Sequence, residues 1–304
     1  MELTPDTTLY WNFENFFTYS HVSFQVVRHL LSLTVAAFAA GLVYFILSAN
    51  QIAPRYRLAS SISAVVMVSA AFEIGNLLVV WSNSFTFDPA VMRYVPAEGS
   101  VFSNGYRYLN WSIDVPMLTT QLLVVMGLTK AVYWSQWWKL TIAGLVMVWF
   151  SYFASFFESY RLVPGGNPVT YWVLFGIATV AWLYIYWALL GLVKDARTRM
   201  SERAGRTLSQ CYWLLFGSWL IYPIAIAMPT IWPTETGVVA RQVLYTVADI
   251  TSKLVFGFLV GRVALLRSAD EGFPMAVSTE DPEIEAPDRF RATEPGATRG
   301  AKVR

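Results

Sequence analysis

The chain is poor in charge and almost free of cysteine. Only 14% of its 304 residues are charged and 56% are hydrophobic, whereas soluble domains carry about 25% charged residues. This deficit excludes a soluble globular protein and indicates an integral membrane protein. Cys211 is the single cysteine, which excludes intrachain disulfides and cysteine-rich metal sites. We expect it to be a small buried core residue. The net charge of +2 comes from basic residues dispersed among short loops, so we expect no nucleic-acid partner.

Long apolar runs make up most of the chain instead. Seven stretches reach the roughly 20 residues that a helix needs to cross a bilayer, so we predict an all-α membrane protein, a bundle of seven transmembrane helices in the lipid bilayer. The predicted spans are residues 22–48, 59–82, 106–129, 137–158, 169–193, 207–229 and 238–265. Residues 84–105 form a longer connection, and we predict a two-stranded β-hairpin flap there.

The chain divides into three predicted parts. Residues 1–20 form a short amphipathic extracellular cap, residues 21–267 the helical domain, and residues 268–304 an acidic, Pro-rich, disordered cytoplasmic tail. Basic residues concentrate in the first, third and fifth connections, and loops of that kind face the cytoplasm. We therefore expect the N-terminus outside the cell membrane and the C-terminus inside. The start lacks a basic segment followed by an apolar one, so we expect no cleaved signal peptide.

Lys253 stands in an apolar run, with Asp249 four residues before it. A lone ammonium at bilayer depth costs roughly 3 kcal/mol, so such a residue needs a partner or a chemical role. An amine on a desolvated lysine condenses with an aldehyde to give a Schiff base, and the spacing puts Asp249 on the same helix face to balance its charge. The alternative is a structural Asp–Lys pair that holds two helices together. These two residues alone do not decide between the interpretations.

The third span carries a stripe of polar residues. Arg107, Asn110, Asp114 and Gln121 are separated by three, four and seven positions, which places all four on one helix face. Inside a membrane such a stripe is expected to face a cavity or pathway. The alternative is a set of interhelical hydrogen bonds, worth below about 1–2 kcal/mol each, but these do not need a charged Arg and Asp together. Pro116 removes one intrahelical hydrogen bond, and we expect a kink beside the site.

These residues together resemble a microbial rhodopsin over roughly residues 10–266. The resemblance rests on Lys253 with Asp249 and on the sequence Arg107-Tyr-Leu-Asn-Trp-Ser-Ile-Asp-Val-Pro. It implies a light-driven ion transporter rather than an enzyme, with all-trans retinal bound to Lys253 as a protonated Schiff base. The retinal-packing residues that it implies are Trp111, Pro116, Trp219, Tyr222 and Pro223.

The triplet Asn110, Asp114 and Gln121 narrows the resemblance. In family members that pump protons outward, the positions that match Asn110 and Gln121 are usually carboxylates, and a neutral carboxamide accepts no proton. The pattern here is similar to that of the light-driven sodium-pumping rhodopsins of the Asn-Asp-Gln group. A retained carboxylate at Asp114 also argues against an anion site, because it repels anions. The resemblance thus implies Asp114 as counter-ion and transient proton acceptor, with Asn110 and Asp249 as transient sodium ligands.

Other positions match residues of known role in these pumps. The resemblance implies that Arg107 and Gln121 line the ion pathway, and that Ser69 faces Asn110 and Asp114. Glu14, Glu158 and Arg241 match an extracellular ion-release cluster, although an interfacial salt-bridge network is an equally good interpretation. The remaining matches are Gln242 and Tyr245 in the outer hydrogen-bond network, and Ser60 and Gly261 at the cytoplasmic entrance. His29 lies with Arg28 on the first span, and we expect it at the rim or at a protomer interface rather than as a ligand. A homo-pentamer is implied by the family.

Glu73 departs from the pattern, because an apolar residue is expected at its position, one turn beyond Ser69. An intramembrane carboxylate is a functional candidate, and we expect it to influence Asp114 or the outer exit. The alternative is a protonated or Arg-paired structural residue. For the whole chain, the competing functions are an outward proton pump, especially without sodium, and a sensory rhodopsin.

Overall fold

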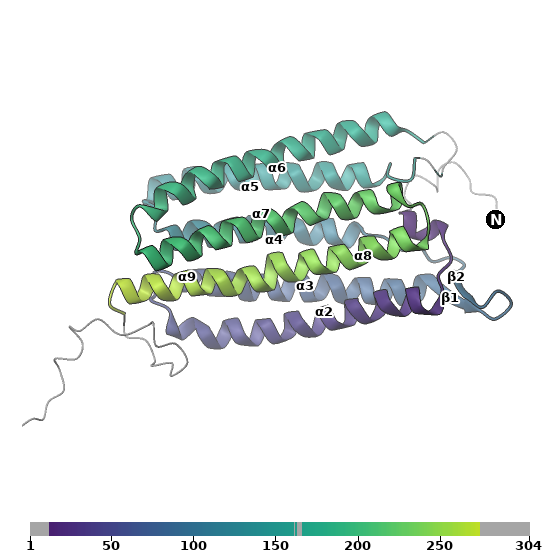
Figure 1. Ribbon diagram of the computed structural model, residues 1–304, viewed down its shortest axis with the longest axis horizontal. Helices are drawn as coiled ribbons and strands as arrows, with labels where there is room; N and C mark the ends of the chain where they lie inside the picture. Colours follow the sequence, from purple (N-terminus) through teal and green to yellow (C-terminus); the bar gives the residue numbers. More distant parts are fainter. Residues whose placement is uncertain (1–11, 161, 163–165, 274–304) are drawn as a thin grey trace, which may run out of the picture.

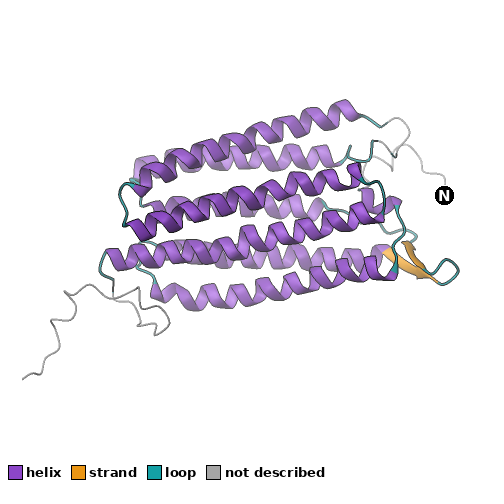
Figure 2. Ribbon diagram, viewed as in Figure 1, coloured by secondary structure: helices purple, strands orange, loops and turns teal. Residues whose placement is uncertain are grey.

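The protein is a bundle of long helices that run side by side (Figure 1). The computed structural model describes residues 12–160, 162 and 166–273. The cap prediction for residues 1–11 and the tail prediction for residues 274–304 lie outside the described residues. Figure 2 shows that helices make up nearly all of the described chain and that one small hairpin extends from one end of the bundle.

The helices begin and end close to the predicted spans. The long helices are α2 (His21–Ser48), α3 (Arg57–Ser84), α4 (Gly105–Met126), α5 (Lys130–Ser155), α6 (Pro168–Arg197), α7 (Glu202–Ile231), α8 (Glu235–Asp249) and α9 (Phe256–Asp270). The short elements are η1 (Phe13–Phe16), η2 (Ala49–Gln51), η3 (Ile250–Val255) and the strands β1 (Phe85–Asp88) and β2 (Arg93–Pro96).

Local chemistry explains several helix ends. Ser20 begins α2 and Ser201 begins α7, because each side chain accepts a hydrogen bond from a backbone N–H in the first turn. Asn167 caps α6 in the same way, with Pro168 at the first helical position, where its missing N–H costs no helix bond. Gly127 ends α4 in the left-handed conformation, at φ 63°.

Six helical segments are long and apolar enough to cross a membrane, among the residues that the structure describes. Helix α4 is not one of these six, and it carries the polar stripe that includes Arg107 and Asp114. It nevertheless packs between α3 and α5 in the bundle. With α4 included, the architecture is the predicted seven-helix membrane bundle, in which α8, η3 and α9 form the seventh span.

The hairpin flap is confirmed, with β1 antiparallel to β2 and Phe85 opposite Pro96. Tyr19 pairs with Tyr94 of β2 through two backbone hydrogen bonds of 2.8 Å, which ties the start of α2 to the hairpin. Arg93 adds an ion pair of 2.5 Å to Glu235 at the start of α8. The flap is therefore fastened to two helices at one end of the bundle.

The fourth span differs most from its prediction of residues 137–158. Helix α5 begins seven residues earlier, at Lys130, and ends at Ser155. Its first two turns contain Lys130, Trp134 and Trp137 and have little continuous apolar character, so the sequence pattern did not show that the helix continues there. A second difference is the π-helical turn η3, which interrupts the seventh span at Lys253 itself. Such turns are rare and occur frequently at functional sites.

Candidate functional site

Lys253 lies at the centre of a buried charge cluster. Its Nζ atom lies 3.1 Å from Asp114 Oδ2, 3.1 Å from Asp249 Oδ1 and 3.2 Å from Glu73 Oε2. Lys253 and the three carboxylates are all buried. Three carboxylates therefore surround one amine, from α3, α4 and the end of α8. We call Glu73, Arg107, Asp114, Asp249 and Lys253 the inner cluster.

Arg107 supplies the second cation of the inner cluster. Its Nη1 atom lies 2.6 Å from Asp249 Oδ2 and 3.6 Å from Glu73 Oε1, and its guanidinium stands over the ring of Tyr245 at 4.9 Å. Two cations face three carboxylates, so the cluster has an excess of negative charge when all of its groups are ionised. This arrangement is suited to holding a cation at Lys253 or to accepting a proton from it.

The other members of the α4 stripe extend to both sides of Lys253. Asn110 Oδ1 accepts a hydrogen bond of 3.1 Å from Lys253 Nζ, and Ser69 donates one of 2.6 Å to Asp114 Oδ1. Gln121 lies further along α4 and donates to Ser63 at 3.1 Å. All four predicted stripe residues are buried, so the stripe faces the interior of the bundle.

Several polar atoms of the inner cluster are held by ion pairs or packing but make no hydrogen bond within the described chain. Glu73 Oε1, Arg107 Nε and Asp114 Oδ2 have no hydrogen-bond partner among the described residues, and neither does Trp111 Nε1 beside them. Buried polar groups are normally satisfied, and exceptions are expected where a site binds a ligand or water. These atoms therefore mark the region as one built to take further polar partners.

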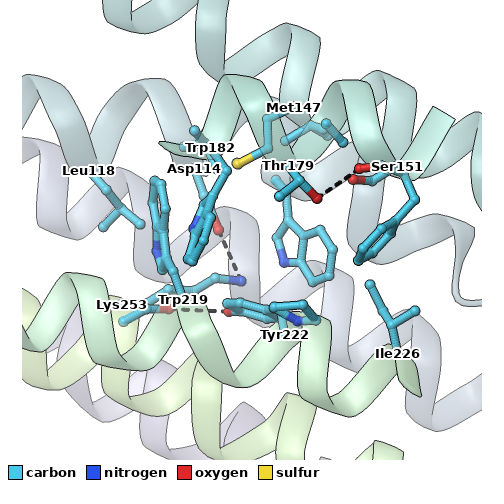
Figure 3. A pocket seen from close by; sticks show the side chains of 17 residues that line it. Asp114, Leu118, Met147, Ser151, Thr179, Trp182, Trp219, Tyr222, Ile226 and Lys253 are labelled. Carbon is cyan, nitrogen blue, oxygen red and sulfur yellow. Dashed lines mark hydrogen bonds and ion pairs between the residues drawn. The ribbon is translucent and has the colours of Figure 1, made fainter. Parts of the chain in front are cut away.

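An apolar pocket begins at Lys253 and extends across the bundle (Figure 3). In the view shown, Trp182 and Trp219 stand beside Lys253 and Asp114, and Ser151 lies on the opposite side of the pocket. Further lining residues are Trp111, Val115, Leu118, Met147, Phe175, Tyr222, Pro223 and Ile226. Long, flat aromatic walls that lead to a buried amine fit a linear apolar aldehyde such as retinal, attached through Lys253.

Tyr222 joins the pocket to the inner cluster. Its hydroxyl donates to Asp249 Oδ1 at 2.8 Å and lies 3.2 Å from Ser252 Oγ. Its ring meets that of Trp111 edge-on, with centroids 4.8 Å apart. Of the five predicted retinal-packing residues, Trp111, Trp219, Tyr222 and Pro223 line the pocket, whereas Pro116 is buried in α4 without lining it.

A second buried cluster lies towards the hairpin end of the bundle. Arg241 pairs with Glu14 Oε2 at 2.5 Å and with Glu158 Oε2 at 2.9 Å. Gln242 donates to Glu14 Oε1 at 2.7 Å and to Asn104 Oδ1 at 3.1 Å. We call these five residues, Glu14, Asn104, Glu158, Arg241 and Gln242, the outer cluster. Gln242 also accepts a hydrogen bond of 3.1 Å from Arg107, so it joins the two clusters.

Tyr19 borders the outer cluster and donates to the Glu14 backbone carbonyl at 2.6 Å. Burial, together with the nearby Glu14 carboxylate, raises the pKa of the Tyr19 hydroxyl well above its ordinary value. The hydroxyl therefore stays a neutral donor at physiological pH.

Some predicted residues lie away from both clusters. Ser60 donates to the Phe45 backbone carbonyl at 2.9 Å, Gly261 is partly exposed on α9, and Arg28 and His29 are exposed on the outside of α2. Within residues 12–160, 162 and 166–273, no group of three or more His, Cys, Asp or Glu residues is arranged to hold a metal ion.

Three participants were not predicted from the sequence. Asn104 donates to Glu14 Oε1 at 3.0 Å and stands just before α4, where a loop role was expected. Ser252 contacts Tyr222, and the π-helical turn around it has no sequence signature. Trp182 lines the pocket from α6. The sequence signal for Trp182 was weak, because it is one of several aromatic residues in an apolar run.

Comparison with known proteins agrees with this geometry. The sequence profile for Bacteriorhodopsin-like protein matches residues 25–266. Green-light absorbing proteorhodopsin from Gamma-proteobacterium EBAC31A08 is 22% identical over 253 residues, which cover 83% of this chain and 89% of the relative. The solved structure of xanthorhodopsin, described as a light-driven ion pump with dual chromophore, is 29% identical with a TM-score of 0.75. That of thermophilic rhodopsin is 29% identical with a TM-score of 0.77, and each match covers 84% of this chain and 99% of the other.

Proposed function

The chain belongs to the bacteriorhodopsin-like proteins and is a microbial rhodopsin, and from this premise we propose that it is a light-driven pump that moves sodium ions out of the cell. The observation that carries the proposal is the composition of the α4 stripe. Asp114 is its single carboxylate, and amides stand at Asn110 and Gln121. An amide cannot accept or return a proton at physiological pH. The stripe therefore supports one local proton transfer rather than a proton relay across the membrane.

The protein binds retinal covalently on Lys253, as microbial rhodopsins do on a lysine. Retinal supplies the light-driven isomerisation that starts each cycle. The residues proposed to hold it are Trp111, Trp219, Tyr222 and Pro223 along the pocket, with Pro116 behind them in α4.

Asp114 is the proposed counter-ion and transient proton acceptor. Its Oδ2 atom forms an ion pair of 3.1 Å with Lys253 Nζ, so it is placed to receive a proton from that atom. Ser69 orients the carboxylate through its other oxygen. While Nζ carries positive charge, it repels a cation nearby, and proton transfer to Asp114 removes that barrier.

The proposed ion path runs along α4 from Gln121 to Arg107. Once the barrier is removed, a sodium ion enters past Gln121 and is held transiently by oxygens of Asn110 and Asp249. Carboxylate and carboxamide oxygens suit such a hard cation. Return of the proton from Asp114 restores the positive charge and expels the ion past Arg107. The outer cluster, with Glu14, Glu158 and Arg241, is the proposed release site.

The direction depends on orientation. The connections at the Gln121 end of the bundle contain or adjoin several basic residues, and loops of this composition face the cytoplasm. We therefore place the N-terminus and the hairpin outside, and Gln121 on the cytoplasmic side. The basic residues at that end are Arg55, Arg57, Lys130, Lys194, Arg197, Arg199, Arg203 and Arg206. Exposed Arg28 and His29 on α2 support the proposal of a protomer interface, with a pentamer expected from the resemblance.

A light-induced pH measurement tests the ion. Cells that express the protein are illuminated in NaCl or in KCl, with and without a protonophore. A sodium pump gives passive alkalinisation of the medium that requires sodium and grows with protonophore. Acidification that protonophore abolishes, in both salts, would overturn the sodium proposal. The Lys253→Ala variant, which cannot bind retinal covalently, is illuminated in the same way as the negative control.

An outward proton pump is the second candidate. Glu73 favours it, because its carboxylate lies 3.2 Å from Lys253 Nζ and gives the inner cluster a second group on the Asp114 side that is able to accept a proton. In this case Glu73→Gln is expected to weaken light-driven acidification in sodium-free medium.

A further inference from the structure

Pro116 creates a gap in the hydrogen-bond ladder of α4. It has no backbone N–H, so the carbonyl of Ser112 loses its usual partner one turn earlier. The gap separates the two ends of the polar stripe, with Asp114 on one side and Gln121 on the other. The geometry of α4 at this point therefore sets the position of Gln121 relative to the inner cluster.

Hydroxyl groups from the next turn hold this weak point. Thr119 and Thr120 both donate to the Pro116 carbonyl, at 3.0 and 2.6 Å. Side chains that bond back to the helix in this way are able to bend it. Thr120 in turn accepts a hydrogen bond of 2.9 Å from Trp137 Nε1, which belongs to α5. A chain of hydrogen bonds thus runs from the neighbouring helix to the Pro116 carbonyl, one turn beyond the Ser112 carbonyl that lost its partner.

Helix α5 also contacts α4 on the other side of Pro116. Gly144 lies so close to Val115 that an added Cβ would stand 2.7 Å from Val115 Cγ1. Trp137 and Gly144 are seven residues apart and therefore share one face of α5. The same face supports α4 before Pro116 by close packing and after it by a hydrogen bond. Neither Trp137 nor Gly144 lines the described pocket at Lys253.

We propose that α5 braces α4 at Pro116, and that Trp137 is a positioning residue that holds Gln121 and the inner cluster in register through Thr120. The brace stabilises the resting arrangement. When the light cycle displaces the part of α4 that follows Pro116, the Trp137–Thr120 hydrogen bond breaks. The cycle ends only when this bond forms again. Because the bond forms during the return step and lowers its barrier, removal of the indole N–H or of the Thr120 hydroxyl slows the return to the resting state.

The test uses Trp137→Phe and Thr120→Val in the full-length, retinal-bound protein. Flash photolysis measures the recovery of the resting absorption, and each variant is expected to recover about fivefold more slowly, the factor that corresponds to one net hydrogen bond. The double variant is expected to recover no more slowly than either single variant, because both remove the same bond. In the dark, hydrogen exchange of the α4 amides after Pro116 is expected to increase in all three.

Matched variants separate the brace from general packing. Trp138→Phe changes an exposed tryptophan on the same turn of α5, and Thr120→Ser keeps the hydroxyl, so both are expected to recover at the wild-type rate. Normal recovery and normal exchange in Trp137→Phe and Thr120→Val would overturn the proposal, even if thermal stability fell. Multiplied effects in the double variant would also overturn it. Both readouts are independent of which ion is transported, so failure of the sodium proposal leaves this test intact.

Discussion

The inner and outer clusters have similar charges, but they differ in how many of their polar atoms form hydrogen bonds. Each holds one more carboxylate than cations, three against two around Lys253 and two against one around Arg241. The inner cluster leaves polar atoms of Glu73, Arg107 and Asp114 without hydrogen-bond partners, and within the described chain no side-chain atom of the outer cluster is left so. A fully satisfied buried network is rigid, whereas a partly satisfied one is open to rearrangement.

From this difference we expect the inner cluster to rearrange and the outer cluster to stay in place. Asp114 Oδ2 and Glu73 Oε1 are held by ion pairs, to Lys253 at 3.1 Å and to Arg107 at 3.6 Å, and no hydrogen bond within the described chain fixes them further. In the outer cluster, every displacement breaks an existing bond. We therefore expect substitutions in the inner cluster to change colour and transport, and substitutions in the outer cluster, the proposed release site, to lower stability and slow ion release without changing the colour.

The largest effect is expected from Lys253→Ala. Without the amine no covalent attachment is possible, so purified protein is expected to be colourless and its cells to show no light response. Absorption spectroscopy of protein expressed with added retinal measures this, with Lys139→Ala as a control at an exposed lysine. A coloured covalent adduct in Lys253→Ala would contradict the assignment of the attachment site.

Asp114→Asn is expected to reduce light-driven transport to the background level. The variant cannot accept a proton, so the positive charge at Nζ persists and continues to exclude cations. Light-induced pH changes in cells with matched pigment content measure the loss, and Asp270→Asn, at an exposed position, is the control. Sustained sodium efflux from Asp114→Asn would rule out the proposed gate.

Arg241→Gln tests the structural side of the comparison. It leaves two buried carboxylates without their cation, and breaking a buried ion pair in this way costs about 3–5 kcal/mol. Thermal denaturation in detergent is expected to show a much lower midpoint with little change in absorption maximum. Arg206→Gln breaks an exposed i,i+4 pair with Glu202 and is expected to have almost no effect. A stable Arg241→Gln protein of altered colour would reverse the roles given to the two clusters.

The smallest effect is expected from Glu73→Gln. Loss of a carboxylate 3.2 Å from Nζ weakens stabilisation of the positive charge in the resting state, so absorption is expected to move to longer wavelength, by less than in Asp114→Asn. Glu158→Gln, in the outer cluster, is expected to leave the colour unchanged. Equal spectral shifts in the two variants would show that the clusters are not electrically distinct.

The sequence predicts the features that follow from residue periodicity and from the free-energy cost of charged groups in a membrane. Apolar runs gave the seven spans, and the expense of a lysine at membrane depth drew attention to Lys253. The four-residue spacings within the third span placed Asn110 and Asp114 on one face, and both lie against Lys253. Glu73 was noted as an unexpected carboxylate, and the structure places it in direct contact with Lys253.

Contacts between residues that are far apart in the chain, and that only packing brings together, could not be predicted from the sequence. Asn104 is one polar residue among several in a loop, and only packing brings it to Glu14 and Gln242. The first turns of α5 contain lysine and tryptophan rather than an aliphatic run, so the predicted span began too late. The hydrogen bond from Trp137 to Thr120 could not be predicted either, because no sequence pattern links position 120 to position 137.

The π-helical turn at Ile250–Val255 has a consequence for insertions and deletions in the seventh span. A π turn accommodates an additional residue within an otherwise α-helical segment. Deleting Ile250, Thr251 or Ser252 would restore regular winding and shorten the spacing between Asp249 and Lys253 from four residues to three, which turns the two side chains about 60° apart at about 100° per residue. Either Asp249 or Lys253 would then leave its present face. The length of this short stretch is therefore constrained as strongly as the identity of its lysine, and two proteins that differ by a single residue here would not share the same site.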